Sequence, residues 1–314
     1  MNSAPNRRRP AGRVTLADVA ARARVDPSVV SKVVSGDGAL RIRPETRRRV
    51  LAAVRETGYR PNALARSLRS ARAGILGLFV PDFTDPGHAR IVEGAEAAAA
   101  ESGMLLVTGG AGGRGLRHYA DLLGPGRVDG ILLVRDGTGS GVPGELTRLG
   151  TPWLVLELGG GQARRRVVLD DDRADALAVE HLVSLGHRRI AHLPVRRTGA
   201  TREGGMAAMR TVLRRPARPT GVIVPDVASA VGALDAVRAA GLTVPADVSL
   251  VVTRDLPPAA ELTPALTAVR APFDGLGRRG VELLVRRGAD RSVAEVLSAG
   301  VELVVRGSTG HPRS

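Results

Sequence analysis

Three short stretches near the N-terminus place apolar residues at the spacing of one helix face. These inward positions are Leu16, Val19, Ala20 and Ala23 in the first stretch, Val30, Val33 and Val34 in the second, and Val50, Leu51 and Val54 in the third. Thr15 and Asp26 are good N-caps, and Pro27 and Pro44 can each begin a helix, where a missing N–H costs nothing. Gly58 ends the third stretch. Two short helices joined by a tight turn and braced by a third predict a helix-turn-helix.

From Gly74 onward the pattern changes to short apolar runs that alternate with helical stretches. A first series contains "GILGLFV", "GMLLVT", "VDGILLV" and "PWLVLE", and a second begins with "RVVLD" and continues with "RRIAHL", "TGVIV" and "VSLVV". Strand–helix alternation of this kind predicts parallel sheets, here two of them. Such sheets bind ligands at the carboxyl ends of their strands, often between domains.

The positive charge of the chain is concentrated at one end. Residues 1–72 hold 17 Lys/Arg against 5 Asp/Glu, which accounts for +12 of the net charge of +15. A coding bias toward arginine explains why Lys32 is the only lysine, but it does not explain the concentration of charge. The asymmetry therefore predicts an N-terminal module that binds nucleic acid and a near-neutral module with another role.

Composition excludes several classes of protein. With no cysteine in the chain, disulfide frameworks, thiolate nucleophiles and cysteine zinc sites are all excluded. We find no apolar run long enough to span a bilayer, and the charged N-terminus leads into no apolar segment of a secretion signal. We expect a soluble, cytoplasmic protein that makes no contact with membranes.

The stretches "VTLADVAARARVDPSVVSKVVSG" and "RPETRRRVLAAVRETGYRPNALARSLRS" together resemble the headpiece of the LacI/GalR (lac repressor) family of bacterial transcription regulators. The resemblance implies that Pro27, Ser28 and Lys32 lie where family members read bases. It also implies that "PNALARSLRS" forms a hinge helix whose Leu68 wedges into the minor groove. The residues expected to contact DNA are Leu16, Pro27, Ser28, Val29, Ser31, Lys32, Thr46, Tyr59, Asn62, Ala65 and Leu68.

Two of these assignments have plainer alternatives. Lys32 stands where the family usually has arginine; it can reach guanine as a point charge, or it can be a solvated charge on an exposed helix face. Leu68 can be an ordinary linker residue. The loop "SGDGALRIRP" is also about two residues longer than the family norm, and Arg43 replaces a usual serine cap.

The landmarks "GRVDGILLV", "HLVSLGHRRIAHL" and "AAGLTVPADVSLV" resemble the family's periplasmic-binding-protein-like core. The expected fold is a small all-α helix-turn-helix headpiece followed by an α/β core of two parallel-sheet lobes. We place a disordered basic arm at 1–12, the headpiece at 13–60, the hinge helix at 61–73 and the core at 74–314. Within the core, the proximal lobe covers about 74–158 and 271–298, and the distal lobe covers about 159–270 and 299–307. The resemblance also implies a homodimer.

Two other hypotheses compete with that of a transcription regulator: a dinucleotide-binding enzyme and a solute-binding protein. "GGAGGRG" contains Gly110, Gly112 and Gly115 in a G-x-G-x-x-G pattern, the outline of a dinucleotide-binding loop, but it does not open the sheet. A solute-binding protein of the envelope would need the export signal that we do not find. The histidines show no metal-ligand spacing, and Asp170–Asp172 lies where the family begins a helix. We therefore expect no enzyme activity, no cofactor and no metal.

The expected function is a sequence-specific regulator, most often a repressor in this family, that binds a pseudo-palindromic operator. A small-molecule effector should bind between the lobes, and the residues expected to contact it are Asp82, Asp85, Arg202, Asp226 and Arg254. Arg254 stands where relatives usually carry an effector-binding aspartate. Compared with the family that the chain resembles, the segment between Met209 and Arg215 is short by about twenty residues, the length of a strand–helix unit. A sugar-like ligand, an anionic metabolite and no ligand at all remain open.

Overall fold

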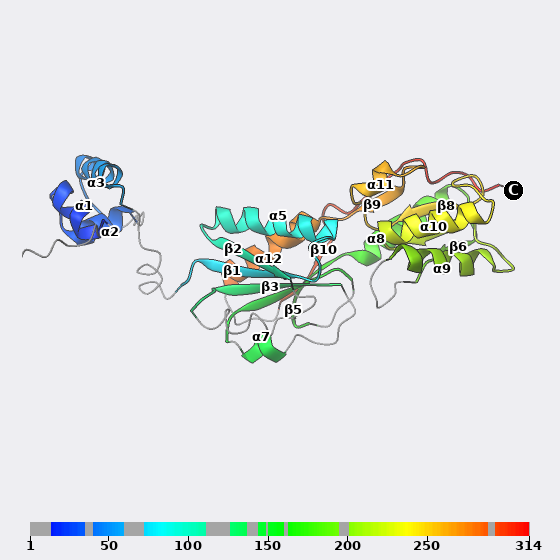
Figure 1. The fold of residues 1–314 in the computed structure, drawn as a ribbon, viewed down its shortest axis with the longest axis horizontal. Helices are drawn as coiled ribbons and strands as arrows, with labels where there is room; N and C mark the ends of the chain where they lie inside the picture. The colour runs from blue at the N-terminus through cyan, green and yellow to red at the C-terminus, as the bar shows by residue number, and fades with distance from the viewer. Residues whose placement is uncertain are drawn as a thin grey trace, which may run out of the picture. The chain divides into compact units, whose positions relative to one another are not determined.

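The computed structural model describes most of the chain and divides it into two compact units, Met1–Ala73 and Gly74–Ser314 (Figure 1). The described residues are 14–34, 40–59, 72–110, 126–136, 144–148, 150–159, 163–194, 201–287 and 293–313. Within these ranges, no helix is long and apolar enough to cross a bilayer.

The first unit contains three helices, α1 (Leu16–Ala23), α2 (Pro27–Val34) and α3 (Pro44–Thr57). The start of α1 is fixed by a capping box, in which the Asp18 N–H donates to the Thr15 hydroxyl and the Asp18 carboxylate accepts from the Thr15 N–H. The end of α3 is fixed by Gly58, which adopts the left-handed conformation at φ 64°. The three helices that the apolar spacing predicts are therefore present with the predicted ends.

A small apolar core holds these helices together. Its fully buried members are Val19, Ala20, Ala23, Val30, Val33, Val50 and Ala53. The prediction that Leu51 points inward is wrong, because its side chain is 40% exposed. Successive helical residues are about 100° apart, so the burial of Val50 and Ala53 turns Leu51 toward solvent.

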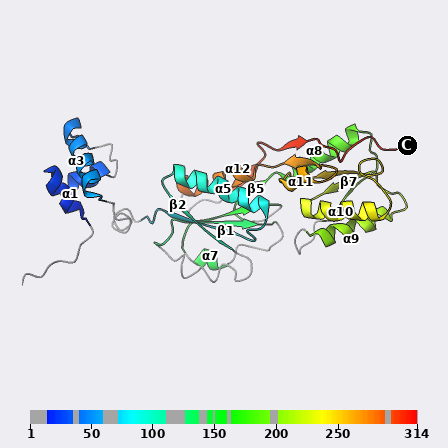
Figure 2. The ribbon, with the colours of Figure 1, turned by 45° about the horizontal axis from the view of Figure 1, so that its top comes forward.

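The second unit begins with a six-stranded parallel sheet in the order β10-β5-β4-β3-β1-β2. Its strands are β1 (Ile75–Val80), β2 (Leu105–Gly110), β3 (Gly130–Arg135), β4 (Trp153–Glu157), β5 (Arg165–Leu169) and β10 (Val293–Leu297). The helices α5 (Pro86–Glu101) and α12 (Phe273–Arg287) cover one face, and α7 (Gly144–Arg148) lies on the other (Figures 1 and 2).

Glycines allow α5 and α12 to pack backbone to backbone. A Cβ atom at Gly277 of α12 would overlap the carbonyl oxygen of Ile91 in α5, and one at Gly94 would overlap the carbonyl oxygen of Asp274. Because backbone atoms cannot rotate away as a side chain can, these two positions accept only glycine at the observed helix separation.

A five-stranded sheet in the order β11-β9-β8-β7-β6 forms the second lobe. Its strands are β6 (Ile190–His192), β7 (Gly221–Val224), β8 (Ser249–Val252), β9 (Thr267–Arg270) and the antiparallel β11 (Glu302–Val304). The helices of this lobe are α8 (Asp171–Ser184), α9 (Arg202–Leu213), α10 (Val227–Ala239) and α11 (Pro258–Glu261). The two-lobed α/β core is therefore present as predicted.

The boundary between the lobes differs from the expectation. The distal lobe was expected to begin at about residue 159, whereas β5 pairs with β4 and β10 in the six-stranded sheet. The chain therefore leaves the proximal lobe after Leu169. The pattern of "RVVLD" predicts a buried strand, but it carries no information on which of two sheets the strand joins.

The connection between α9 and β7 in the distal lobe is short, as expected from the short segment in the sequence. Residues 214–220 alone lead from α9 into β7, and the three-residue β6 stands at the edge of the sheet in the described structure. The lobe thus has no strand between α9 and β7.

Candidate DNA-binding surface and inter-lobe cleft

The second helix of the headpiece has one buried side and one exposed side. Val30 and Val33 are buried in the headpiece core, while Pro27, Ser28 and Lys32 are exposed. The Asp26 carboxylate accepts a hydrogen bond from the Ser28 N–H at 2.8 Å and so fixes the first turn of the helix. Hydrogen bonds from the Ser28 side chain and backbone lower the pKa of Asp26. This exposed face has the polar and cationic groups that can meet base edges and phosphates.

The other residues expected to contact DNA divide into two groups. Leu16, Val29 and Tyr59 are partly buried against the headpiece core, and Ser31 and Thr46 are also partly exposed. Asn62, Ala65 and Leu68 lie outside the described residues. Arg43 precedes α3 in an extended conformation and its side chain makes no capping hydrogen bond, as expected for a position that lost its serine.

Three of the residues expected to bind effector are engaged with the backbone at helix and turn starts. The carboxylate of Asp82 accepts from the Thr84 N–H, that of Asp85 from the Gly87 N–H, and that of Asp226 from the Ser229 N–H. All three follow the carboxyl ends of strands. Arg202 forms an ion pair with Asp235 at 2.6 Å and is largely exposed, so its guanidinium is held by α10.

Arg254 joins the two lobes. It follows β8 in the distal lobe, and its Nη2 donates to the carbonyl oxygen of Leu158, which follows β4 in the proximal lobe, at 3.0 Å. Asp171, at the start of α8, lies close enough that burial raises its pKa while the charge of Arg254 opposes the rise. Arg254 was expected from the sequence to contact an effector; the structure shows instead that it bridges the two lobes.

A buried histidine lies at the carboxyl edge of the six-stranded sheet and was not among the expected site residues. His88 is 1% exposed; its Nδ1 lies 2.7 Å from the carbonyl oxygen of Asp82 and its Nε2 lies 3.1 Å from Oδ1 of Asp136. Burial alone would lower the pKa of His88, but the hydrogen bonds with Asp136 and Asp82 and the nearby charge of Asp85 raise it. The pair thus favours an imidazolium–carboxylate contact at the carboxyl end of β3.

Glu157 is a second buried polar residue at this edge that the sequence pattern did not indicate. It ends β4 directly before Leu158, it is 1% exposed, and its Oε2 has no hydrogen-bond partner in the described structure. Burial raises its pKa, while Arg135 and Arg166 lower it; the Nε of Arg166 lies 3.9 Å from Oε2. A buried acceptor without a donor is costly, so this carboxyl can accept a hydrogen bond from a ligand.

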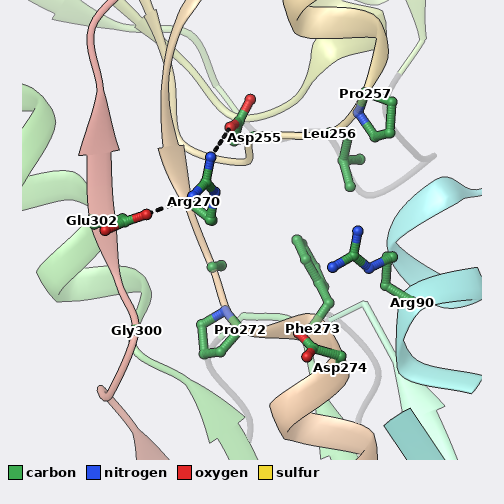
Figure 3. A pocket seen from close by; sticks show the side chains of 11 residues that line it. Arg90, Asp255, Leu256, Pro257, Arg270, Pro272, Phe273, Asp274, Gly300 and Glu302 are labelled. Carbon is green, nitrogen blue, oxygen red and sulfur yellow. Dashed lines mark hydrogen bonds and ion pairs between the residues drawn. The ribbon is translucent and has the colours of Figure 1, made fainter. Parts of the chain in front are cut away.

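A cavity of about 350 Å³ lies where the two lobes meet. Figure 3 shows Phe273 and Leu256 facing it, with the guanidinium of Arg90 beside the Phe273 ring. On its other side Arg270 pairs with Glu302 at 2.6 Å and lies 3.8 Å from Asp255. The remaining lining comes from Pro257, Ala271, Pro272, Asp274 and Gly300. These residues come from α5, α12, the ends of β9 and β11 and the segments that follow β8 and β9, so no sequence motif could have grouped them.

The enzyme-like patterns in the sequence have structural roles or lie outside the described part. His187 is buried with Nδ1 near the Thr220 hydroxyl and Nε2 near the Gly310 carbonyl, and Asp170 caps α8. Gly110 ends the edge strand β2, while Gly112 and Gly115 are not described. Among the described residues, no group of three or more His, Asp or Glu is placed to hold a metal.

Comparison with known families agrees with both units. Residues 15–62 match the model of bacterial regulatory proteins of the lacI family, and residues 192–309 match a periplasmic binding protein-like domain. The chain is 31% identical over 312 residues to the HTH-type transcriptional repressor PurR of Escherichia coli O139:H28 (strain E24377A / ETEC), covering 87% of this chain and 90% of PurR. The chain belongs to the LacI family. It is therefore a DNA-binding transcription regulator, as its headpiece predicts.

Solved structures of LacI-family proteins have the same fold. The lac repressor dimer bound to operator and the anti-inducer ONPF matches with a TM-score of 0.76 at 25% identity, covering 95% of this chain and all of that one. The complex of the regulator CelR with cellobiose matches with a TM-score of 0.67 at 29% identity, covering 94% of this chain and all of that one. LacI-family regulators bind DNA operators and small-molecule effectors, typically as dimers. These relatives are regulators rather than enzymes.

Proposed function

We propose that this LacI-family protein is a repressor that binds a pseudo-palindromic operator as a homodimer and responds to a small molecule bound between its lobes. The exposed face of α2 is the observation that carries the DNA-binding part. Pro27, Ser28 and Lys32 project from a helix whose opposite side is buried in a capped three-helix headpiece. A rigid helix with one polar face is what entry into a major groove requires.

Specificity in this proposal is shared between the headpiece and the linker. Lys32 can donate to guanine O6 or N7 but lacks the fixed fork of arginine, and Pro27 offers no donor, so readout by α2 should be modest. Leu68, expected from the sequence as a minor-groove wedge, would add selectivity at the flexible centre of the operator. Symmetry follows, because two headpieces of a dimer read two half-sites.

The effector part of the proposal rests on the carboxyl edge of the proximal sheet. Its described side chains include the unpartnered Oε2 of Glu157 and the exposed carboxylate of Asp136. The nearby Arg254 is already bonded to the Leu158 carbonyl. Because the buried Oε2 of Glu157 lacks a hydrogen-bond donor in the described structure, we favour a ligand that carries hydrogen-bond donors, such as a polyol or an amine, over an anion.

Selection from random duplex DNA with the full-length protein at moderate salt tests the proposed function. We expect a pseudo-palindrome of two half-sites about a flexible central step, with specific affinity of roughly 10⁻⁸ to 10⁻¹¹ M. Charge-driven binding without an enriched sequence would contradict the proposal.

The same selection with Lys32→Ala tests the role of α2. We expect the preference at one position of each half-site to relax, with a loss of about 1–3 kcal/mol on the wild-type site. A loss that is uniform across sequences, with a reduced salt dependence, would make Lys32 a phosphate contact instead.

A further inference from the structure

Five arginines lie where the chain enters the strands of the six-stranded sheet. Arg127 precedes β3, Arg164 and Arg165 stand at the start of β5, Arg148 ends the helix that leads into β4, and Arg286 lies near the end of α12, which leads toward β10. Because β3, β4, β5 and β10 are neighbours in the sheet, the five arginines share one edge. We call it the amino edge.

Among the described residues, the amino-edge arginines are not held in ion pairs. In the described residues, no ion pair joins any of the five to a carboxylate. Two carboxylates near this edge are otherwise engaged: Glu101 binds Arg278 in a two-pronged pair at 2.7 and 3.0 Å, and Asp129 accepts from the Gly74 N–H at 2.7 Å.

The other described arginines of this lobe behave differently. Arg90 lies near Glu93, Arg166 near Glu157, and Arg279 pairs with both Glu282 and Glu295. The concentration of unpaired positive charge at the amino edge is thus a local feature of the lobe and not a consequence of arginine-rich composition.

An aromatic side chain stands within this basic surface. The guanidinium of Arg165 lies 5.2 Å from the centroid of the Trp153 ring, and Trp153, the only tryptophan of the chain, begins β4 next to β5. Stacking holds the guanidinium in place while leaving its N–H groups free to donate. A guanidinium held in this way is suited to a phosphate contact.

The opposite edge of the same sheet carries mostly the opposite charge, with Arg135 at the end of β3 as an exception. Asp82, Asp136, Glu157 and Asp170 follow or end its strands at the carboxyl side. The sheet is therefore acidic toward the inter-lobe cleft and basic at the end where β1 begins, directly after the segment that joins this unit to the headpiece.

We propose that the amino edge of the proximal lobe is a second duplex-binding surface, which adds phosphate contacts to those of the headpiece. Duplex DNA is the partner favoured by charge and by connectivity, since any duplex held by the headpiece is tethered through residues 60–74 to this edge. The inference rests on the proposed function only in taking duplex DNA as the partner; it requires no particular operator.

Salt-dependent binding of the full-length protein to a random-sequence duplex of about 40 base pairs tests the proposal. The test variant replaces Arg127, Arg164 and Arg165 with glutamine. The control variant makes the same change at Arg210, Arg214 and Arg215 of the distal lobe, which are exposed and for which the described residues supply no ion pair. Each lost phosphate contact makes the negative slope of log K against log salt shallower by about 0.9. We therefore expect the slope of the amino-edge variant to be shallower than that of the wild type by roughly 2 to 3. The control should keep the wild-type slope.

Two results would overturn the proposal: an unchanged slope in the amino-edge variant, or an equal loss in the control, which would reduce the effect to net charge. Replacing the same three residues with lysine should restore the slope, and failure to do so in a protein with the wild-type melting temperature would also count against phosphate contacts. The proposed function is judged separately. If the wild type enriches no sequence in the selection from random duplex DNA, the proposed operator is contradicted, but the comparison of salt slopes still tests the amino edge.

Discussion

At the scale of single residues, the contact between His88 and Asp136 makes stability depend on pH. His88 is buried, and its pKa is raised in the folded protein, so the stabilisation is fully present below its unfolded pKa of about 6.5. It is lost as pH rises through the higher folded pKa. Neither residue could be paired from the sequence, because they are 48 positions apart and join only where β1 and β3 lie side by side.

Asp136→Asn tests this pH dependence. The carboxylate is 54% exposed, so the pair should be worth only about 0.2–1 kcal/mol, or up to about 4 °C in melting temperature at about pH 6. The difference from wild type should shrink by about pH 8.5, as His88 loses its charge. Asp172→Asn, an exposed change in α8, serves as the control without a pH-dependent difference. A difference of the same size at both pH values would show that Asp136 acts through structure alone.

At the scale of elements, the sequence predicted most of what local pattern controls. The spacing of Val30 and Val33, the start at Pro44 and the stop at Gly58 predicted the headpiece helices, because helix ends and apolar faces are set by neighbours in sequence. The sequence did not predict which sheet β5 joins, nor that Glu157 is buried with an oxygen that has no hydrogen-bond partner in the described structure. Both depend on which distant strands lie alongside, and a glutamate at a strand end is usually read as solvated.

The crossing of α5 and α12 provides a prediction at this scale. Gly277→Ala places a methyl group on the Ile91 carbonyl oxygen and must separate the helices, so we expect a loss of about 1–3 kcal/mol or more, measured by thermal melting. Gly144→Ala is the matched control, because its Cβ would meet only the flexible end of Arg148 at an ordinary distance. A melting temperature for Gly277→Ala equal to that of wild type would mean that the helices are free to move apart.

At the scale of the whole molecule, the two edges of the proximal sheet differ in charge and in what they contact. The basic amino edge is directed to DNA in our proposal, and the acidic carboxyl edge meets the distal lobe through the bond between Arg254 and Leu158. A ligand can shift such a molecule only by binding one arrangement of the lobes more tightly than another. Glu157 lies one residue from that bond and has an acceptor still to be satisfied, so a ligand that donates to it would couple binding to the position of Arg254.

Glu157→Gln tests that coupling. The pKa of Glu157 is raised by burial, so its ionised form opposes folding at neutral pH, and the uncharged glutamine should raise the melting temperature of the free protein. In a thermal-shift panel of sugars, polyols, amines and anionic metabolites, a ligand at 100 times its Kd stabilises the wild type by about 2.7 kcal/mol. We expect the shift from a polyol or amine and its loss in Glu157→Gln. A shift produced only by anions, or one that survives the substitution unchanged, would place the effector on Arg254 or elsewhere in the cleft.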